Sequence, residues 1–207
     1  YLEGENSQYF RFNDSKLRQS GIIEDYAVTI SLFSGKKSLQ SATTVSSDIE
    51  SSVNNLTNEI NALRNPLSLI PDNEFTSFPD NFDSVEIIKS GQLPDRNEIL
   101  DALMDIITKD YLTGVWTSGK IFRACSTSEG ANHWFEKDSF IFDFSLIDKK
   151  ENMVKVLFPG NCWDKSKFNT AFQEASDKLK LMNKPKMELK PGKYRVWFEP
   201  HAVADFV

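Results

Sequence analysis

Apolar residues occupy every second position from Phe140 to Leu146, and this alternation restricts the fold more than any other feature of the sequence. A period of two is that of a β-strand with one buried face. The polar residues Asp148–Asn152 predict a solvated turn, after which the alternation resumes from Val154 to Phe158. Because a connection this short cannot cross over a sheet, the two strands must pair antiparallel.

The first part of the chain shows the same strand period. Alternating residues around Phe10–Phe12 and over Val28–Leu32 predict strands, and a return strand rich in Ser and Thr is expected at residues 38–45. Clusters of Asn, Asp, Ser and Gly at 13–15 and 34–37 predict the turns. This region is therefore expected to form antiparallel hairpins.

Three segments carry apolar residues at the spacing of amphipathic helices, at residues 48–65, 96–109 and 164–183. The stripe of the first helix is Ile49, Val53, Leu56, Ile60 and Leu63, and that of the third is Phe168, Ala171, Phe172, Ala175, Leu179 and Met182. Both stripes are too short for a coiled coil, so packing onto the sheet is expected.

Capping residues and a proline predict where the first helix begins and ends and where the second begins. Ser47 and Glu50 fit the spacing of a capping box, and Pro66 is expected to end the first helix. Asp95 and Glu98 are expected to open the second helix.

These elements predict an α+β fold, with an antiparallel or mixed sheet and three principal helices packed on it. The 207 residues allow one large domain or two small ones. An internal break is expected within the proline-containing stretch 66–95, which also carries a short strand at Val85–Ile88. A final strand is predicted from Tyr194 to Phe198, after the Pro191-Gly192 turn.

Composition excludes several classes of function. The net charge of −6 argues against general nucleic-acid binding, which needs clustered Lys and Arg. No apolar run approaches the roughly 18 residues that span a bilayer, and no signal peptide is visible. Two cysteines are too few for a disulfide framework. A cytoplasmic location is therefore expected, with neither nucleic acid nor membrane as a partner.

Two motifs resemble sites for phosphate binding and acyl transfer. Gly114–Ile121 nearly matches a phosphate-binding loop, but Ile121 stands where a magnesium-binding Ser or Thr is needed, and a turn at Ser118-Gly119 is the simpler interpretation. Ser34–Lys37 has the Ser-x-x-Lys spacing, but it lies in a predicted hairpin turn without companion motifs.

Soft ligands and nucleophiles are few. Cys125 and His133 flank a predicted hairpin and could approach one another, whereas a buried Cys and a surface His explain the pair as well. Asp143 lies within the aromatic strand, a context that hints at burial. No spacing typical of metal ligands occurs, so no catalytic residue and no metal ligand is predicted.

A peptide- or partner-binding surface is one interpretation of four residues, Arg11, Trp116, Arg123 and Trp134. Arginine and tryptophan are enriched in such surfaces. Ordinary packing in the core and at its rim is the alternative, because large aromatic residues dominate interiors as well as interfaces.

Four sets of segments together match a known family. They are Tyr9–Asn13 with Leu17–Gly21, Ser126–Gly130 with Asn132–Glu136, Phe142–Leu146 with Trp163-Asp164, and Pro191–Pro200 with Ala202–Ala204. On these segments the chain resembles the N-terminal region of the TldD/PmbA family of metallopeptidases, also called the modulator-of-gyrase family. The residues of the first set are more similar to those of PmbA-type (TldE-like) members.

The resemblance implies that residues 1–207 are the N-terminal, non-catalytic α+β domain of a zinc-dependent peptidase. Such a domain contributes to dimerisation and to the chamber that admits flexible peptides. A homodimer or a heterodimer with a TldD-type subunit is implied. The family binds zinc through a His-Glu-x-x-x-His type motif, which this chain lacks, so no metal ligand is carried over. Because the apolar pattern at Ala202–Val207 is unfinished, a metal-binding half is expected beyond it. The alternative is a standalone protein-binding or scaffolding module without enzymatic activity.

Overall fold

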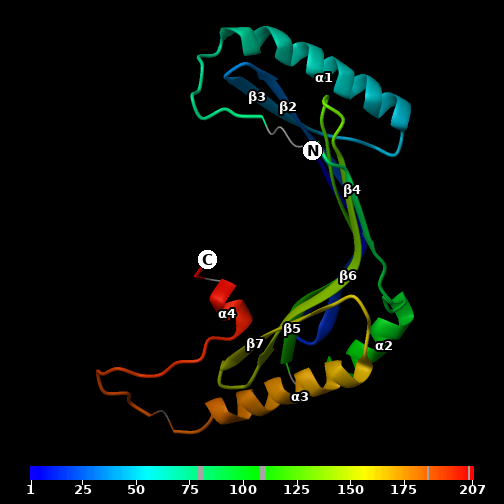
Figure 1. The fold of residues 1–207 in the computed structure, drawn as a ribbon. Helices are drawn as coiled ribbons and strands as arrows, with labels where there is room; N and C mark the ends of the chain where they lie inside the picture. The colour runs from blue at the N-terminus through cyan, green and yellow to red at the C-terminus, as the bar shows by residue number, and fades with distance from the viewer. Residues whose placement is uncertain (79–81, 108–110, 186, 205) are drawn as a thin grey trace. The chain divides into compact units, whose positions relative to one another are not determined.

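The computed structural model describes residues 1–78, 82–107, 111–185, 187–204 and 206–207 (Figure 1). Within these residues the chain forms a seven-stranded sheet and four helices, the α+β fold that the sequence predicts. The elements are β1 (Leu2–Asn13), β2 (Lys16–Ser34), β3 (Lys37–Thr44), α1 (Ile49–Leu69), β4 (Val85–Lys89), α2 (Arg96–Ile107), β5 (Tyr111–Ser126), β6 (Asn132–Ile147), β7 (Met153–Gly160), α3 (Lys165–Met182) and α4 (Pro200–Ala204).

The sheet has the strand order β3-β2-β1-β5-β6-β4, and β7 also pairs with β6. Hairpin partners such as β2 and β3 are antiparallel, as their short connections require. β4 confirms the strand predicted at Val85–Ile88, and it runs parallel to β6, with Val85 opposite His133. The sheet is therefore mixed.

The chain divides into two compact units, each built from three segments. The first unit contains Tyr1–Tyr9, Gly21–Leu93 and Thr117–Phe140, and the second contains Phe10–Ser20, Pro94–Trp116 and Ile141–Val207. The long strands β1, β2, β5 and β6 contribute residues to both. The predicted break within 66–95 stays a prediction, although one of these boundaries, Leu93/Pro94, falls in that range.

The core of the second unit is an aromatic cluster between the sheet and α3. Phe142 stacks on Phe144 with ring centroids 4.5 Å apart, and the ring of Phe168 lies 5.9 Å from that of Phe142. Trp116 and Trp163 meet edge to face at 5.4 Å. The alternating residues of Phe140–Leu146 are all buried, as their period predicts.

The third predicted helix is confirmed as α3, which packs against β7 (Figure 1). The carboxylate of Asp164 caps it by accepting hydrogen bonds from the backbone N–H groups of Ser166 and Lys167. The stripe is buried at Phe168, Phe172, Ala175 and Leu179. Met182, predicted to belong to this stripe, is 47% exposed instead.

The second predicted helix is confirmed as α2, and positions 108 and 109 of the predicted range lie outside the described residues. Asp95 accepts hydrogen bonds of 2.8 Å from the N–H groups of Asn97 and Glu98 and so caps the helix. Ile99, Leu103 and Ile106 are buried. Met104, on the same helix, is 47% exposed.

The first helix departs from its prediction at both ends. Asp48 is the N-cap in place of Ser47, and its carboxylate accepts a hydrogen bond from the N–H of Ser51. The helix continues through Pro66 to Leu69, because the burial of Leu67 offsets the hydrogen bond that a proline cannot donate.

The packed face of α1 is also rotated from the predicted stripe. Ile49 and Val53 are exposed, whereas Ser52 and Leu67 are buried against the rest of the first unit. The predicted packing onto the sheet is confirmed, since α1 contacts β3. Ser41 on β3 donates a hydrogen bond of 3.2 Å to Glu59 on α1.

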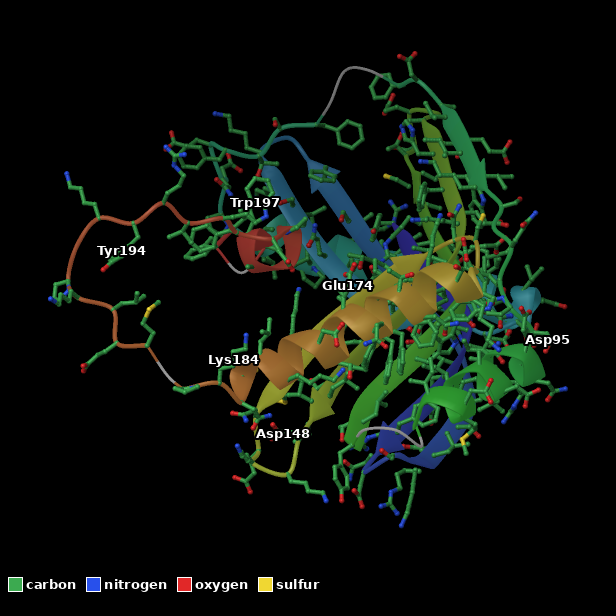
Figure 2. All side chains as sticks on the ribbon, turned by 90° about the horizontal axis from the view of Figure 1, so that it is seen from below. Asp95, Asp148, Glu174, Lys184, Tyr194 and Trp197 are labelled. Atoms are coloured by element: carbon green, nitrogen blue, oxygen red, sulfur yellow. The ribbon has the colours of Figure 1, made fainter. Side chains whose placement is uncertain are left out.

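Two predictions of local structure are wrong. The turn expected at Ser118-Gly119 lies in the middle of β5, where Gly119 allows β1 to approach closely. The strand expected from Tyr194 to Phe198 has no regular structure. A strand forms only where a neighbouring strand pairs with it, and in the described part of the chain no strand of the sheet pairs with this segment. Figure 2 shows Tyr194 and Trp197 on this irregular segment between α3 and α4.

The first unit buries far fewer apolar side chains than the second. Among the described residues, its buried apolar side chains are Leu67, Ala131 and Phe140. Large apolar residues such as Ile22, Phe75 and Ile88 remain exposed in this unit.

In the described part of the chain, no helix is both long enough and apolar enough to cross a membrane.

Candidate functional site

The β5–β6 hairpin brings Arg123 and Trp134 to one region of the first unit. Its turn is closed by hydrogen bonds from Thr127 N–H to the Ala131 carbonyl (3.0 Å) and from Gly130 N–H to the Thr127 carbonyl (3.2 Å). Gly130 adopts a φ of 102°, which favours glycine. The hydroxyl of Ser126 donates to the side-chain carbonyl of Asn132 at 2.7 Å and joins the two strands.

Two shallow hollows lie on this hairpin and on the adjoining strand β4. A hollow of about 420 Å³ is bordered by polar residues that include Ser84, Glu86 and Asn132. A smaller one of about 150 Å³ is bordered by Arg123 and Trp134 with Val85, among others. Arg123 and Trp134 thus border the same hollow, and the binding surface predicted from the sequence stays a prediction.

Each of these two side chains is held by neighbours in the first unit. The guanidinium of Arg123 forms an ion pair with Glu3 at 3.7 Å and donates a hydrogen bond of 3.0 Å to the carbonyl of Phe122. The ring of Trp134 lies 5.8 Å from that of Phe122, which contacts Tyr26 in turn. Because neighbours on a strand point to opposite faces, the side chain of Arg123 lies on the face of the hairpin away from the rings of Phe122 and Trp134.

The other two predicted surface residues, Arg11 and Trp116, belong to the second unit. Arg11 is exposed on β1. Trp116 is 0% exposed, so its assignment to a surface is wrong and the alternative of core packing holds for it. The side chains of β5 point alternately to the two faces of the sheet, and that of residue 116 points to the face that α3 covers. Its ring therefore belongs to the aromatic cluster.

Lys120, the lysine of the phosphate-loop-like motif, lies in mid-strand and forms an ion pair with Glu136 on β6. The hydrogen bond that Lys120 donates to Glu136 raises the pKa of Lys120 above its ordinary value. The motif is therefore a strand with an internal ion pair and lacks the loop geometry that cradles a phosphate. Likewise Ser34–Lys37 is the β2–β3 turn, in which Gly35 has a φ of 57°.

Cys125 and His133 both border the two hollows. Cys125 is half-buried and His133 is exposed, and Cys125 and Cys162 are both free thiols. Within the described residues no group of three or more His, Cys, Asp and Glu could hold a metal ion. Among the described residues the pair therefore belongs to no ligand set for zinc.

Asp143 is not buried, contrary to the hint from its sequence context. Its side chain is 44% exposed and forms an ion pair of 3.2 Å with Lys155 on β7. Because neighbours on a strand point to opposite faces, Asp143 faces away from the cluster that contains Phe142 and Phe144.

A third hollow was not anticipated from the sequence. It has a volume of about 680 Å³, and residues of β2, α1 and the tip of the β5–β6 hairpin line it. Val28, Ile30 and Leu32 lie in it with Leu56 and Ile60 of α1, and alternation alone cannot show which helix lies against a strand.

Comparison with known proteins gives a match of fold. No protein-family model matches the sequence, and no curated protein matches it. The structure is similar to crystal structures of TldE from Thermococcus kodakarensis (TM-score 0.62, 11% identity, 86% of this chain and 43% of that chain) and of a proposed modulator of DNA gyrase from Bacteroides thetaiotaomicron (TM-score 0.63, 13% identity, 93% and 47%). It is also similar to a proposed modulator of a DNA gyrase from Thermotoga maritima (TM-score 0.58, 12% identity, 85% and 42%).

The described chain therefore has the fold of part of these proteins, in agreement with the resemblance found in the sequence. It spans less than half of the length of each, at 43%, 42% and 47%.

Proposed function

We propose that this chain is the N-terminal, non-catalytic domain of a zinc-dependent peptidase of the TldD/PmbA family. Its role is to contribute to dimerisation and to the chamber that admits flexible peptides. The observation that carries the proposal is the likeness in fold to TldE and to two proposed gyrase modulators over most of this chain. The four sequence segments that resemble the family support it independently.

The chain's own residues support a non-catalytic role. Zinc peptidases hold the metal with three protein ligands and leave one position open for water. The described residues contain no such set and do not fit a zinc ion. The metal and the hydrolytic step are therefore assigned to another part of the protein or to a TldD-type partner, and no step is derived for this chain.

The surface of the first unit supports a role in assembly. Ile22, Phe75 and Ile88 are 73%, 85% and 56% exposed, and such side chains are typically covered in the core of a subunit interface. Arg123 and Trp134 border one hollow, and both residue types are enriched among the side chains that dominate interfaces.

The proposal is tested with the full-length protein that carries this chain, alone and mixed with a TldD-type protein. Light scattering is expected to show a homodimer or a heterodimer. Hydrolysis of an unstructured fluorogenic peptide is expected to require zinc and to be absent from residues 1–207 alone. A full-length protein that neither associates nor supports hydrolysis under any of these conditions would favour the alternative, a scaffolding module without enzymatic activity.

A further inference from the structure

The hollow of about 420 Å³ in the first unit is bordered by a carboxylate and an aromatic ring on neighbouring strands. Glu86 lies on β4 and Trp134 on β6, and the parallel register pairs these two residues. Paired residues of neighbouring strands direct their side chains to the same face of a sheet, so Glu86 and Trp134 face the hollow together. We call it the Glu86–Trp134 hollow.

Small side chains beside Trp134 leave the space that forms the hollow. The hydroxyl of Ser126 bonds to the side chain of Asn132, so these two residues share one face of the β5–β6 hairpin. Two residues farther along each strand, Ala124 and Trp134 share the same face. Because Ala124 and Ser84 are much smaller than the indole, the ring of Trp134 borders open space.

The ring of Trp134 is held in place by a second aromatic ring. Phe122 lies on β5, with its centroid 5.8 Å from that of Trp134 and the two planes inclined by 51°. Phe122 in turn contacts Tyr26 on β2, with centroids 6.1 Å apart. Trp134 is half-buried, so its ring is positioned before any ligand arrives, which lowers the entropic cost of binding.

The polar groups at the hollow are mainly hydrogen-bond acceptors. The hydroxyl of Ser126 donates to the side-chain carbonyl of Asn132, whose amide nitrogen donates to the Gly130 carbonyl at 3.2 Å. The backbone N–H of Asn132 donates to the hydroxyl oxygen of Ser84 at 2.9 Å. These bonds use donors within the protein, whereas the carboxylate of Glu86 can only accept. A ligand with several N–H donors therefore complements the hollow.

Glu86 is an exposed acidic group, and among the described residues no basic side chain forms an ion pair with it. His133 also borders the hollow, but it alternates with Trp134 and points to the other face, as Arg123 does. In the first unit acidic residues outnumber Lys and Arg by about two to one, and such a surplus attracts cations.

We propose that the Glu86–Trp134 hollow binds the guanidinium group of an arginine side chain presented by a peptide. A guanidinium is planar, stacks on aromatic faces and directs paired N–H donors at a carboxylate. Trp134 supplies the ring and Glu86 the carboxylate, and the hydroxyl oxygens of Ser84 and Ser126 are further acceptors. This goes beyond the proposed function, since it requires neither zinc nor a second subunit. Failure of one proposal therefore leaves the other standing.

The probe is N-acetyl-arginine amide, and its control is N-acetyl-citrulline amide, which has nearly the same shape without the positive charge. Binding to the isotope-labelled chain is followed by nuclear magnetic resonance, at the indole N–H of Trp134 and the backbone N–H of Asn132. Both resonances should shift to saturation, while the indole resonances of Trp116, Trp163 and Trp197 stay in place. The citrulline compound should bind about tenfold more weakly, because it loses the charge-assisted hydrogen bonds.

Two variants separate the contribution of the charge from that of the ring. Glu86→Gln keeps the shape of the side chain and should raise the Kd of the arginine probe about tenfold. Its matched control, Glu74→Gln, removes the same charge beside Asn73, which bonds to the β2–β3 turn at the other end of the strand order, and should leave the Kd unchanged. Trp134→Leu should raise the Kd about threefold, measured at the Asn132 resonance.

Several results would overturn the proposal. One is the absence of any shift at Trp134, and another is equal binding of the arginine and citrulline compounds. Equal losses in Glu86→Gln and Glu74→Gln would assign the effect to the overall charge of the unit. A Trp197 resonance that shifts in parallel with that of Trp134 would show nonspecific contact with indole rings. Should Trp134→Leu fail to fold, the two glutamate variants and the citrulline control still decide.

Discussion

Asp148 illustrates how one carboxylate connects two elements of the second unit. It accepts hydrogen bonds from the N–H groups of Lys150 and Asn152, which close the β6–β7 turn. It also accepts one of 2.6 Å from the side chain of Asn183, at the end of α3. Figure 2 shows Asp148 in this turn and Lys184 at the end of the helix. Hydrogen bonding by the Asn152 side chain is the largest cause that lowers the pKa of Asp148, to about 2.

The first prediction concerns the pH dependence of this contact. The pKa of Asp148 is lower in the folded state than the ordinary value of 3.8, so its stabilising effect is present above that value and is lost as the pH falls through about 2. Asp148→Asn should lower Tm at pH 7, and the difference in Tm from the wild type should shrink toward pH 2. A difference that is constant over this range would contradict the assignment.

Gly119 is a second residue whose identity the structure explains. A Cβ at this position would lie 2.3 Å from the carbonyl oxygen of Asn6 and 2.4 Å from the Cα of Ser7. Both are backbone atoms of β1, so the strand itself would have to move.

We therefore expect Gly119→Ala to destabilise the protein by roughly 1–3 kcal/mol, the usual cost of overpacking. Gly192→Ala is the control, because a Cβ there would meet its nearest atom at 3.6 Å, an ordinary contact. Urea denaturation measures both. Equal stability of the two variants would show that β1 can shift without cost.

At the scale of elements, α3 buries one face against the sheet. Phe168 and Phe172 lie on the rings of β6, with Phe172 stacked on Phe144 at 6.3 Å. The apolar stripe predicted the helix and its buried face, because a helix that covers a sheet must place one side in the core.

Phe172→Ala should lower the free energy of unfolding by about 3–5 kcal/mol, through lost burial and a residual cavity. Leu181→Ala on the same helix is the control, because Leu181 is 55% exposed and surface changes usually stay within about 0.5 kcal/mol. Chemical denaturation of both variants is the measurement. A loss below about 1 kcal/mol at Phe172 would show that this face is not core.

At the scale of the whole molecule, the prediction concerns what the chain does without its partners. Residues 1–207 alone should retain no zinc after dialysis against a chelator and should not hydrolyse peptides, because the described residues contain no cluster of metal ligands. Elemental analysis measures the zinc. Stoichiometric zinc after dialysis would show that the ligands lie in this chain after all.

Assembly is the last prediction at this scale. The full-length protein should form a homodimer or a heterodimer with a TldD-type subunit, and the isolated chain should associate less, since part of the apolar interface is expected outside it. Light scattering at micromolar concentration distinguishes the cases. A full-length protein that stays monomeric with and without the partner would refute this.

The sequence by itself determined the elements whose periodicity records burial on one face. The alternation at Phe140–Leu146 and the stripe on α3 predicted a strand and a helix, because each pattern is produced by one element facing one core. The β2–β3 turn also followed from local residues, since Gly35 adopts a positive φ that few other residues tolerate.

Only the tertiary structure decided what depends on neighbours distant in the sequence. The helix α1 continues beyond Pro66 where Leu67 is buried, and Gly119 lies within a strand where β1 packs closely against it. Residues Tyr194–Phe198 are irregular, since in the described chain no strand pairs with them. The burial of Trp116 likewise depends on which elements lie against it. Strand pairing is a long-range contact, so periodicity indicates that a residue has a buried face but not what lies against it.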